Sequence, residues 1–366
     1  MLISSQSNKG EIIMTKPHSL DIGDKVAIVS LSSGALGENF AAHELELGKK
    51  RLEEMGLEPV FMPNALKGIK YLAEHPEARA QDLISAFEDK QIKGILCAIG
   101  GRDGYKLLPH ILENKKACQT IKDNPKVFLG YSDSTTHHIM LNSLGLNTFY
   151  GQAFLTDLAE LDTDMLAYSK FWFLNLFISQ KELVLEPSAV WYKERTDFSP
   201  KALNTPREMV LENLGYTSIC QGGKGEGELF GGCIDVIYNM LCPEFEDEKQ
   251  IFAKYNILPA NNAQKMLFLE TSDEKVPPQK FREMITTLKE HKFFKNCAGV
   301  LFGKPQDEKY MQEYMQIIRE ELSDYKVLCN LNFGHAFPHA IIPYGIKVHV
   351  DFDNAEVKFT ETWFND

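Results

Sequence analysis

The sequence predicts an α/β protein, with a parallel, doubly wound sheet in its first half and a mixed α/β second half. Between about residues 25 and 150, short apolar runs alternate with stretches of helical periodicity, which is typical of parallel sheets. A second series of strands and helices begins near residue 207 and closes with two segments that predict a hairpin. A chain of 366 residues is long enough for two domains, each with its own core.

The first half consists of strands that are followed by helices. We expect strands at 25–30, 57–62, 94–99, 126–129 and 147–150, and helices at 38–55, 78–89, 107–112 and 136–144. Ligands of such sheets bind at the carboxyl ends of the strands. Gly100 and Gly101 follow one strand at this edge, and a serine-containing turn follows another. The aromatic stretch 154–177 is expected to be helical and to form part of the core.

The second half begins after a long loop that contains several prolines. This loop, residues 186–206, carries Trp191, which either lines a substrate pocket or packs against the protein. Residues 222–232 are rich in glycine, but they contain two glutamates and lack a Gly-Lys-Ser/Thr ending, so we expect tight turns around a strand rather than a phosphate loop. The remaining expected elements are helices at 233–241, 276–290 and 306–322, strands at 266–270, 299–302 and 326–331, and a hairpin of 346–352 with 357–362.

The patterns divide the chain into four parts. We predict an N-terminal extension at 1–20, a first domain at 21–180, a linker at 181–206 and a second domain at 207–366. Met14 is an alternative start, in which case the preceding residues are a disordered extension.

Charge and composition exclude several classes of protein. The formal net charge of -12 argues against nucleic acid or an anionic membrane as the main partner, since either favours a basic face. No segment approaches the ~20 apolar residues of a membrane span, and the N-terminus lacks a secretory apolar region. We therefore expect a cytoplasmic protein. The seven scattered cysteines include no Cys-x-x-Cys pair and are expected to be small buried side chains rather than disulfides or zinc ligands.

Ser132 is the predicted nucleophile of a hydrolase. It lies in the motif Gly-Tyr-Ser-Asp-Ser-Thr at residues 130–135, between an apolar strand and a helix. Such a turn exposes the hydroxyl at the carboxyl edge of the sheet, beside unpaired helix N–H groups that bind an oxyanion. The Gly-x-Ser-x-Gly pattern is incomplete, because Ser134 replaces the second glycine. The alternative is that Ser132 or Asp133 only caps the helix.

A serine nucleophile needs a base, usually a histidine that is oriented by a carboxylate. His335 follows a predicted strand, whereas His137 and His138 lie on the helix that leaves the serine turn and are interpreted as surface or packing residues. Glu270 ends an apolar strand and is the predicted carboxylate. The alternative is that Glu270 caps the next helix or pairs with a lysine.

A metallopeptidase is a second interpretation of the histidines. His335 and His339 have the i, i+4 spacing of a helical metal site. Pro338 lies between them and disfavours the helix that this spacing needs, and no glutamate completes a His-Glu-x-x-His motif. We therefore expect neither a metal nor an organic cofactor.

Five motifs, taken together and in order, resemble the family of serine peptidases that includes the murein LD-carboxypeptidases and the microcin C immunity proteins. The resemblance extends from about residue 25 to residue 350. The motifs are Gly-Gly at 100–101, Asn-Pro-Lys-Val-Phe-Leu-Gly-Tyr-Ser-Asp-Ser-Thr at 124–135, Gly-Glu-Gly-Glu-Leu-Phe-Gly-Gly at 225–232, Leu-Phe-Leu-Glu at 267–270 and Phe-Gly-His at 333–335.

The resemblance implies a Rossmann-like N-terminal domain and an active site at the interface between the two domains. It implies a Ser-Glu-His triad at Ser132, Glu270 and His335, with an oxyanion hole formed by the backbone N–H groups of Gly101 and Asp133. It also implies that two copies of the chain associate as a homodimer.

Substrate contacts are expected around the double glycine. Gly100 and Arg102 flank the oxyanion turn, and Arg102 is our candidate for binding a terminal carboxylate, with a surface salt bridge as the alternative. The Asn-Pro-Lys motif and the Trp191 insert resemble the MccF-like branch more than the murein enzymes. Gln152 stands where the family has the proline of a Gly-Pro pair, and this departure concerns the substrate rather than the triad.

Three functions are therefore expected in order of preference. The first is hydrolysis of the amide-type bond of peptidyl or aminoacyl nucleotides, for self-immunity or detoxification. The second is release of the terminal D-alanine from a murein tetrapeptide during cell-wall recycling. The third is a ligand-binding module without catalysis, against which the intact serine, glutamate and histidine motifs argue.

Overall fold

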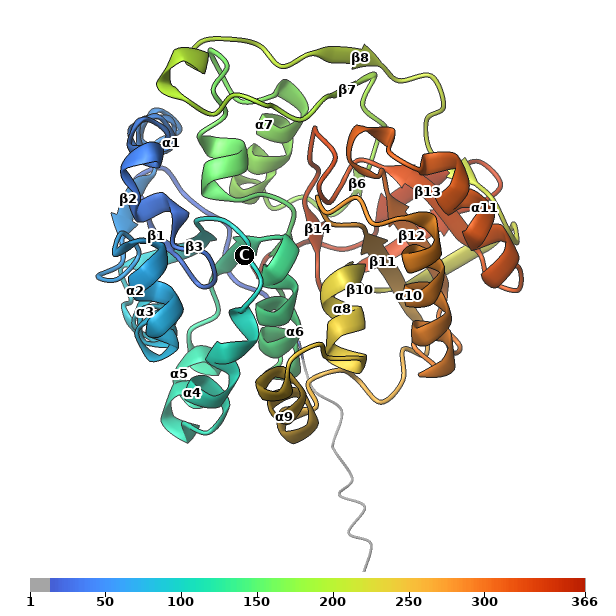
Figure 1. Ribbon diagram of the computed structural model, residues 1–366, viewed down its shortest axis with the longest axis horizontal. Coiled ribbons are helices and arrows are strands. Elements are labelled where there is room, and N and C mark those ends of the chain that lie inside the picture. The colour runs from blue at the N-terminus through green and yellow to red at the C-terminus, as the bar shows by residue number, and fades with distance from the viewer. Residues whose placement is uncertain (1–13, 366) are drawn as a thin grey trace, which may run out of the picture.

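The computed structural model describes residues 14–365 and contains two large sheets that lie side by side with their helices (Figure 1). The predicted fold class is confirmed, because each half is an α/β unit with parallel strands. Residues 1–13 and 366 lie outside the described residues, and so does the disordered extension expected before Met14. Directly after Met14, Thr15 forms a bridge with Leu146 of the first unit.

The first sheet has the strand order β14-β5-β4-β3-β1-β2. Strands β1 to β5 are parallel, and β14, from the far end of the chain, pairs antiparallel with β5. The strands are β1 (Lys25–Val29), β2 (Glu58–Phe61), β3 (Ile92–Cys97), β4 (Val127–Gly130), β5 (Phe149–Tyr150) and β14 (Ile342–Pro343). The helices are α1 (Ala42–Glu54), α2 (Gly68–Glu74), α3 (Pro76–Glu88), α4 (Leu108–Leu112), α5 (Lys115–Asp123), α6 (Thr135–Ser143) and α7 (Ala167–Leu174).

The second sheet has the order β6-β16-β15-β10-β11-β12-β13-β9. Its centre, from β10 to β13, is parallel, and β15 and β16 form the predicted antiparallel hairpin. The strands are β6 (Leu183–Val184), β9 (Thr217–Ser218), β10 (Lys224–Cys233), β11 (Lys265–Glu270), β12 (Gly299–Gly303), β13 (Val327–Leu331), β15 (Lys347–Asp351) and β16 (Glu356–Phe359). The helices are α8 (Ile234–Leu241), α9 (Glu246–Tyr255), α10 (Pro278–Glu290) and α11 (Met311–Glu321).

Two of the expected elements take a different form, and helices α2 and α5 lie where no element was expected. The stretch 154–177 is a π-helical turn (Phe154–Leu158), a loop, α7 and a 3-10 turn (Asn175–Phe177) rather than one helix, because Asp162 and Asp164 bind backbone N–H groups in the loop and compete with helical bonds. The glycine-rich residues 222–232 contain the predicted strand, β10, but this strand continues to Cys233 without the tight turn expected after it. A side chain at Gly227 would place its Cβ 2.3 Å from the Gln264 carbonyl oxygen, so glycine permits the close approach.

Two further segments join the units, one at each end of the boundary between them: α9 at the bottom of the view and β7 with β8 at the top (Figure 1). Helix α9, which the sequence patterns did not predict, reaches the first unit through a hydrogen bond from the Tyr105 hydroxyl to Asp247, 2.9 Å long. On the other side runs the bridging segment, residues 186–212, whose strands β7 (Val190–Tyr192) and β8 (Met209–Leu211) form a small sheet. Arg207 in this segment binds the buried Glu160 of the first unit at 2.6 Å.

The structure also bears on the expectations about cysteines and membranes. All seven cysteines are free, as predicted, but only Cys97, Cys233 and Cys329 are buried; Cys242 is exposed, so the expectation of burial is wrong for that residue. Within residues 14–365, no helix combines the length and the hydropathy that a membrane crossing requires. The predicted domain limits stay a prediction; β6 lies in the expected linker and joins the second sheet, whereas β14 lies in the expected second domain and joins the first.

Candidate active site

Ser132 lies in a sharp turn between β4 and α6. Strand β4 is buried along its whole length, and the chain then enters a short 3-10 turn at Ser132–Ser134. Ser132 has a φ of 61°, in the left-handed region, where the backbone strain of a residue other than glycine is roughly 1–2 kcal/mol. Neither the residue that precedes the 3-10 turn nor Ser134 caps its helix through a side chain, and the Ser132 hydroxyl donates to His335. The capping interpretation of Ser132 is therefore wrong.

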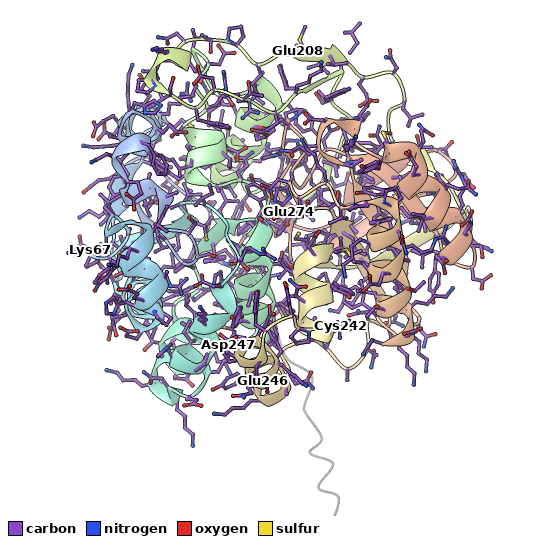
Figure 2. The ribbon with its side chains drawn as sticks, in the orientation of Figure 1. Lys67, Glu208, Cys242, Glu246, Asp247 and Glu274 are labelled. Carbon is purple, nitrogen blue, oxygen red and sulfur yellow. The ribbon has the colours of Figure 1, made fainter. Side chains whose placement is uncertain are left out.

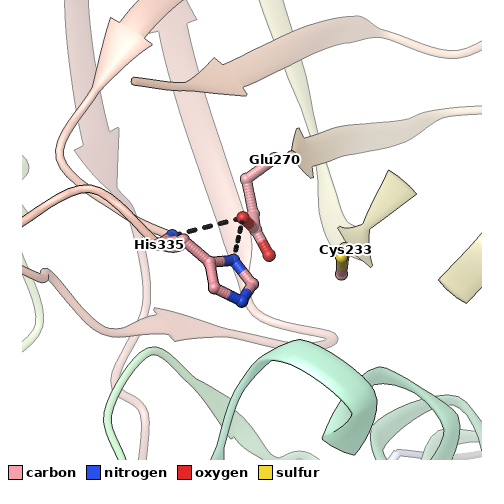
Figure 3. A group of neighbouring side chains, drawn as sticks. All are labelled: Cys233, Glu270 and His335. Atoms are coloured by element: carbon pink, nitrogen blue, oxygen red, sulfur yellow. Dashed lines mark hydrogen bonds and ion pairs between the residues drawn. The ribbon is translucent and has the colours of Figure 1, made fainter. Parts of the chain in front are cut away.

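The second unit carries the two side chains that form a hydrogen-bonded series with Ser132. Glu270 is the last residue of β11, and His335 lies in the loop after β13. His335 Nδ1 donates to Glu270 Oε2 at 2.7 Å, and the backbone N–H of His335 donates to the same oxygen at 3.2 Å (Figure 3). The Ser132 hydroxyl donates to His335 Nε2 at 3.0 Å. The structure thus brings together, across the two units, the three residues predicted as a triad.

Close backbone packing holds this arrangement. Gly334 has a φ of 92°, and a Cβ there would lie 2.5 Å from Glu270 Cγ, so only glycine lets the histidine loop approach the carboxylate. The Tyr131 ring packs edge-on against the His335 ring, with centroids 5.0 Å apart. Because Nδ1 faces the carboxylate, the geometry assigns the tautomer that leaves Nε2 free to accept a proton.

The surroundings of His335 favour its charged form. Burial lowers the pKa of the imidazole, but the charge and hydrogen bond of Glu270, together with the carboxylates of Asp273 and Asp235, raise it to about 9. Asp273 Oδ1 lies 3.9 Å from Nε2 and is largely exposed. Asp235 is bound to the backbone N–H and the hydroxyl of Ser272, so it also holds the loop that follows Glu270.

Of the two predicted oxyanion residues, Asp133 directly follows the nucleophile, and Gly101 adjoins Gly100, which packs on it. A Cβ at Gly100 would lie 3.0 Å from Ser132 Oγ and 3.5 Å from the Asp133 nitrogen, so the double-glycine turn packs directly on the serine turn. The Asp133 side chain accepts hydrogen bonds from Ser32 Oγ at 2.5 Å and from the Gly104 N–H at 2.8 Å. Asp133 thus joins the loops after β1, β3 and β4 around the hydroxyl, a role that the sequence motif did not reveal.

A cleft of about 810 Å³ opens between the two units at Ser132 and His335. Gly100, Gly101 and Arg102 belong to its wall on one side, and α8 and the loop after β11 form the other. Glu274, in that loop, lies near the middle of the view in Figure 2, between the two units. Arg102 is 72% exposed, and its guanidinium lies 3.8 Å from Glu244. Arg102 therefore lines the cleft and also makes the surface ion pair that was the alternative expectation, and its binding of a carboxylate stays a prediction.

Trp191 lies elsewhere. It belongs to β7 in the bridging segment and is only 6% exposed, with Lys304 Nζ 5.2 Å from its ring centroid. It is not among the described residues that line the cleft. The indole therefore packs in this single chain, which is the second of the two roles expected for it.

Three other histidines, His137, His138 and His339, are buried in the structure. His137 and His138 are fully buried, so the surface interpretation is wrong and the packing interpretation is right. Burial lowers the pKa of His137 to about 4 and that of His138 to about 3, and each ring binds a backbone carbonyl, that of Gly104 or Gly130. His339 Nδ1 binds the buried carboxylate of Asp157 at 2.8 Å and faces that partner rather than His335.

One group near the nucleophile has the composition of a metal site. Ligand atoms of Cys233, Glu270 and His335 lie within 4.8 Å of one another (Figure 3). Both Glu270 oxygens already accept hydrogen bonds, from Tyr150 and from His335, and burial raises the pKa of the Cys233 thiol well above its usual value. A metal ion would have to displace the thiol proton of Cys233 and the hydrogen bonds donated to Glu270 before it could bind. Metal-free serine chemistry remains our prediction.

Comparison with known proteins identifies the family. Residues 26–151 match the LD-carboxypeptidase N-terminal domain, and residues 226–350 match the LD-carboxypeptidase C-terminal domain. The chain belongs to the LD-carboxypeptidase family. It is a serine-type carboxypeptidase, as the five motifs predicted.

Relatives of this carboxypeptidase fall in both branches of the family. An MccF-like protein from Streptococcus pneumoniae, solved in complex with AMP, is 44% identical with a TM-score of 0.88, covering 92% of this chain and 98% of that one. A probable murein peptide carboxypeptidase of Bacillus subtilis is 27% identical, over 91% of this chain and 90% of its own. The microcin C7 self-immunity protein MccF of Escherichia coli is 23% identical, over 94% and 96%.

Proposed function

We propose that this carboxypeptidase hydrolyses the amide-type bond of peptidyl or aminoacyl nucleotides, as an MccF-like enzyme of self-immunity or detoxification. The observation that carries the proposal is the hydrogen-bonded series of Ser132, His335 and Glu270, of which Ser132 and His335 line a cleft of about 810 Å³. That volume falls in the range of pockets that enclose whole small molecules and exceeds what one terminal amino acid needs. The AMP complex of the pneumococcal relative supports a nucleotide part of the ligand.

The proposed mechanism assigns one role to each residue. Ser132 Oγ attacks the carbonyl carbon while His335 Nε2 takes its proton, and Glu270 keeps the imidazole oriented and stabilises its positive charge. The N–H groups of Gly101 and Asp133 stabilise the tetrahedral oxyanion, each contributing roughly 3 kcal/mol to the lowered barrier. His335 then gives the proton to the leaving nitrogen, and water, activated by the same histidine, hydrolyses the acyl-enzyme. No metal takes part in this scheme.

Murein recycling is the second proposed function. The Bacillus subtilis relative, a probable murein peptide carboxypeptidase, favours it, and both reactions break an amide through the same acyl-enzyme. The third expectation, a binding module without catalysis, is not proposed, because the chain is a serine-type carboxypeptidase.

One experiment separates the two proposed functions. Wild type and Ser132→Ala are each incubated with an equimolar mixture of an LD-murein tetrapeptide and glutamyl sulfamoyl adenosine, and the products are identified by mass spectrometry. Cleavage of the adenosine conjugate alone, by wild type alone, supports the MccF-like function. D-alanine release would move the protein to murein recycling. Cleavage of neither compound would contradict both enzymatic proposals.

Arg102 is proposed to bind the terminal carboxylate of the substrate. We expect Arg102→Gln to raise KM about tenfold with little change in kcat, since the lost contact is present in both ground and transition states. The check is steady-state kinetics with a substrate that has a free carboxylate, beside the same substrate as its amide. Equal effects on both compounds would show that Arg102 serves only its ion pair with Glu244.

The pKa of His335 predicts the pH dependence. Since the base must be neutral, kcat/KM should rise with pH up to about 9. Asp273→Asn removes an anion that stabilises the imidazolium, so the acid limb of the kcat/KM profile should move to lower pH by about half a pH unit. The shift is small because Asp273 is exposed. Glu274→Gln, one residue on, is the matched control and should leave the limb in place. An unmoved limb in Asp273→Asn would contradict this electrostatic role.

A homodimer is also proposed, as the family resemblance implies. Met209 and Leu211 on β8 are 58% and 65% exposed, and such side chains favour a contact with a second protein surface. Light scattering of the purified protein measures the mass directly, and a monomer at micromolar concentration would contradict the proposal.

A further inference from the structure

The Tyr150 hydroxyl occupies a position between the nucleophile and the carboxylate. Tyr150 ends β5 in the first unit and is fully buried. Its hydroxyl donates to Glu270 Oε1 at 2.5 Å and accepts the backbone N–H of Ser132 at 3.1 Å. Tyr150 therefore makes a direct hydrogen-bonded link between the serine turn of one sheet and the carboxylate of the other.

We infer that Tyr150 is a positioning residue for catalysis. Its hydroxyl fixes the position of the Ser132 turn relative to Oε1 of Glu270. The inference rests on the proposed function, since it assumes that Ser132 and His335 react as assigned there. Tyr150 touches no reacting atom. It acts through the backbone of Ser132 and through the carboxylate that orients His335.

The ring of Tyr150 is held on several sides, so its hydroxyl has a defined place. Its centroid lies 5.5 Å from those of His138 and Phe268, and 6.4 Å from those of Tyr131 and Tyr344. These neighbours come from both units. A ring packed in this way loses little further freedom when its hydroxyl makes two hydrogen bonds, so the positions of both partners are set by the packing.

The first effect of Tyr150 is on the strained turn. Ser132 has a φ of 61°, and such a backbone persists only where the surroundings hold it. The hydrogen bond from the Ser132 N–H to Tyr150 is one such restraint. It also engages this N–H, so the oxyanion must be bound by other donors, in agreement with the proposed pair of Gly101 and Asp133.

The second effect is on the carboxylate. Glu270 accepts one hydrogen bond at Oε1 from Tyr150 and two at Oε2 from His335. Burial raises the pKa of Tyr150 well above its usual value, so the phenol remains protonated and donates at all working pH values. Without this donor, the negative charge of Glu270 is neutralised less by hydrogen bonding, so the carboxylate stabilises the imidazolium of His335 more strongly. The pKa of His335 would then rise, and the base would be neutral over a narrower pH range.

Other groups act on the same histidine and have to stay constant in the test. The titratable or charged groups that face His335 are Glu270 on β11, Asp273 in the loop after it, Asp235 on α8, Cys233 at the end of β10 and Tyr131 after β4. A Tyr150→Phe substitution changes none of them. It removes one oxygen and leaves the ring, so a change in the pH profile is attributable to the lost hydroxyl.

Tyr344→Phe is the matched control. Tyr344 is also fully buried, its ring neighbours that of Tyr150, and its hydroxyl donates to a backbone carbonyl, that of Gly231. The control therefore loses a buried tyrosine hydrogen bond in the same cluster but none to Ser132 or Glu270. Thermal melting of both variants compares their stability.

The test has two measurements. The first is the rate at which an alkyl fluorophosphonate phosphonylates Ser132, monitored by the intact mass of the protein from pH 6 to 10. The second is kcat and KM with the best substrate from the mixture experiment. We expect Tyr150→Phe to slow labelling and lower kcat about 10- to 100-fold, with KM little changed and the acid limb moved upward by about half a pH unit. Tyr344→Phe should keep the wild-type limb and rate. A wild-type rate and limb in Tyr150→Phe would overturn the inference.

Two further arms keep the outcome decisive. If Tyr150→Phe does not fold, 3-fluorotyrosine at position 150 retains the hydroxyl as a stronger donor, and the inference then requires the acid limb to move downward. An unmoved limb would overturn it. Wild type that is not labelled at Ser132, under conditions where the protein is folded, would instead overturn the proposed function and with it the basis of the inference.

Discussion

Replacing Ser132 by alanine is expected to lower kcat by a factor on the order of 10⁶, since removing the nucleophile of a serine peptidase has an effect of that size. The fold should survive. Among residues 14–365, the hydroxyl makes one hydrogen bond, to His335 Nε2, and the imidazole stays held by Glu270. We therefore expect the free energy of unfolding to change by no more than about 1 kcal/mol. Turnover of the preferred substrate and a thermal melt check both parts.

Ser134→Ala is the control for this prediction. Ser134 lies in the same 3-10 turn and is buried, but it has no contact with His335 among the hydrogen bonds of the described residues. It should keep most of the activity. Should Ser132→Ala retain turnover, or Ser134→Ala lose it to the same degree, the nucleophile would not be Ser132.

Replacing Glu270 by glutamine is the second large effect, and we expect kcat to fall about 10⁴-fold, as for the corresponding change in another serine peptidase. The carboxylate offers acceptors to both Tyr150 and His335, whereas an amide offers one acceptor and one donor. One of the two contacts is then reversed or lost, and no negative charge remains to stabilise the imidazolium. The measurement is kcat against pH, together with a thermal melt.

Glu274→Gln again provides a control, because it removes a carboxylate from the same loop and the same cleft without touching the histidine contact. KM for Glu270→Gln should stay within a few-fold of wild type, since Glu270 acts on His335 and not on the substrate. A Glu270→Gln variant with more than about a tenth of wild-type kcat would remove Glu270 from the proposed triad.

The strands and the site residues at their ends were predictable from local pattern. Ser132 and Glu270 each follow an uninterrupted apolar run, and buried parallel strands have this pattern because both of their faces are covered. Since the carboxyl ends of such strands share one edge, a reactive residue there is a candidate for the site. Tyr150 has a comparable position as the last residue of β5, but no pattern in the sequence distinguishes a tyrosine there from a core residue.

Tertiary structure decided which of these residues meet. No sequence spacing relates Ser132 to Glu270 or His335, which lie on a different sheet, and only the packing of the two units brings Oγ within 3.0 Å of Nε2. The same packing buried His137 and His138, which a short polar helix would otherwise expose, and it placed Trp191 under Lys304. It also set Asp273 beside the imidazole.

The amino-acid sequence by itself determined the fold class, the family and the three residues of the proposed triad, because these depend on hydrophobic periodicity and on motifs that are local in the chain. The tertiary structure alone decided the pKa of His335, the shape of the cleft and the link through Tyr150. Each of these is set by groups from separate strands of two sheets, and hydrogen bonds and electrostatic interactions depend on distance in space rather than along the chain.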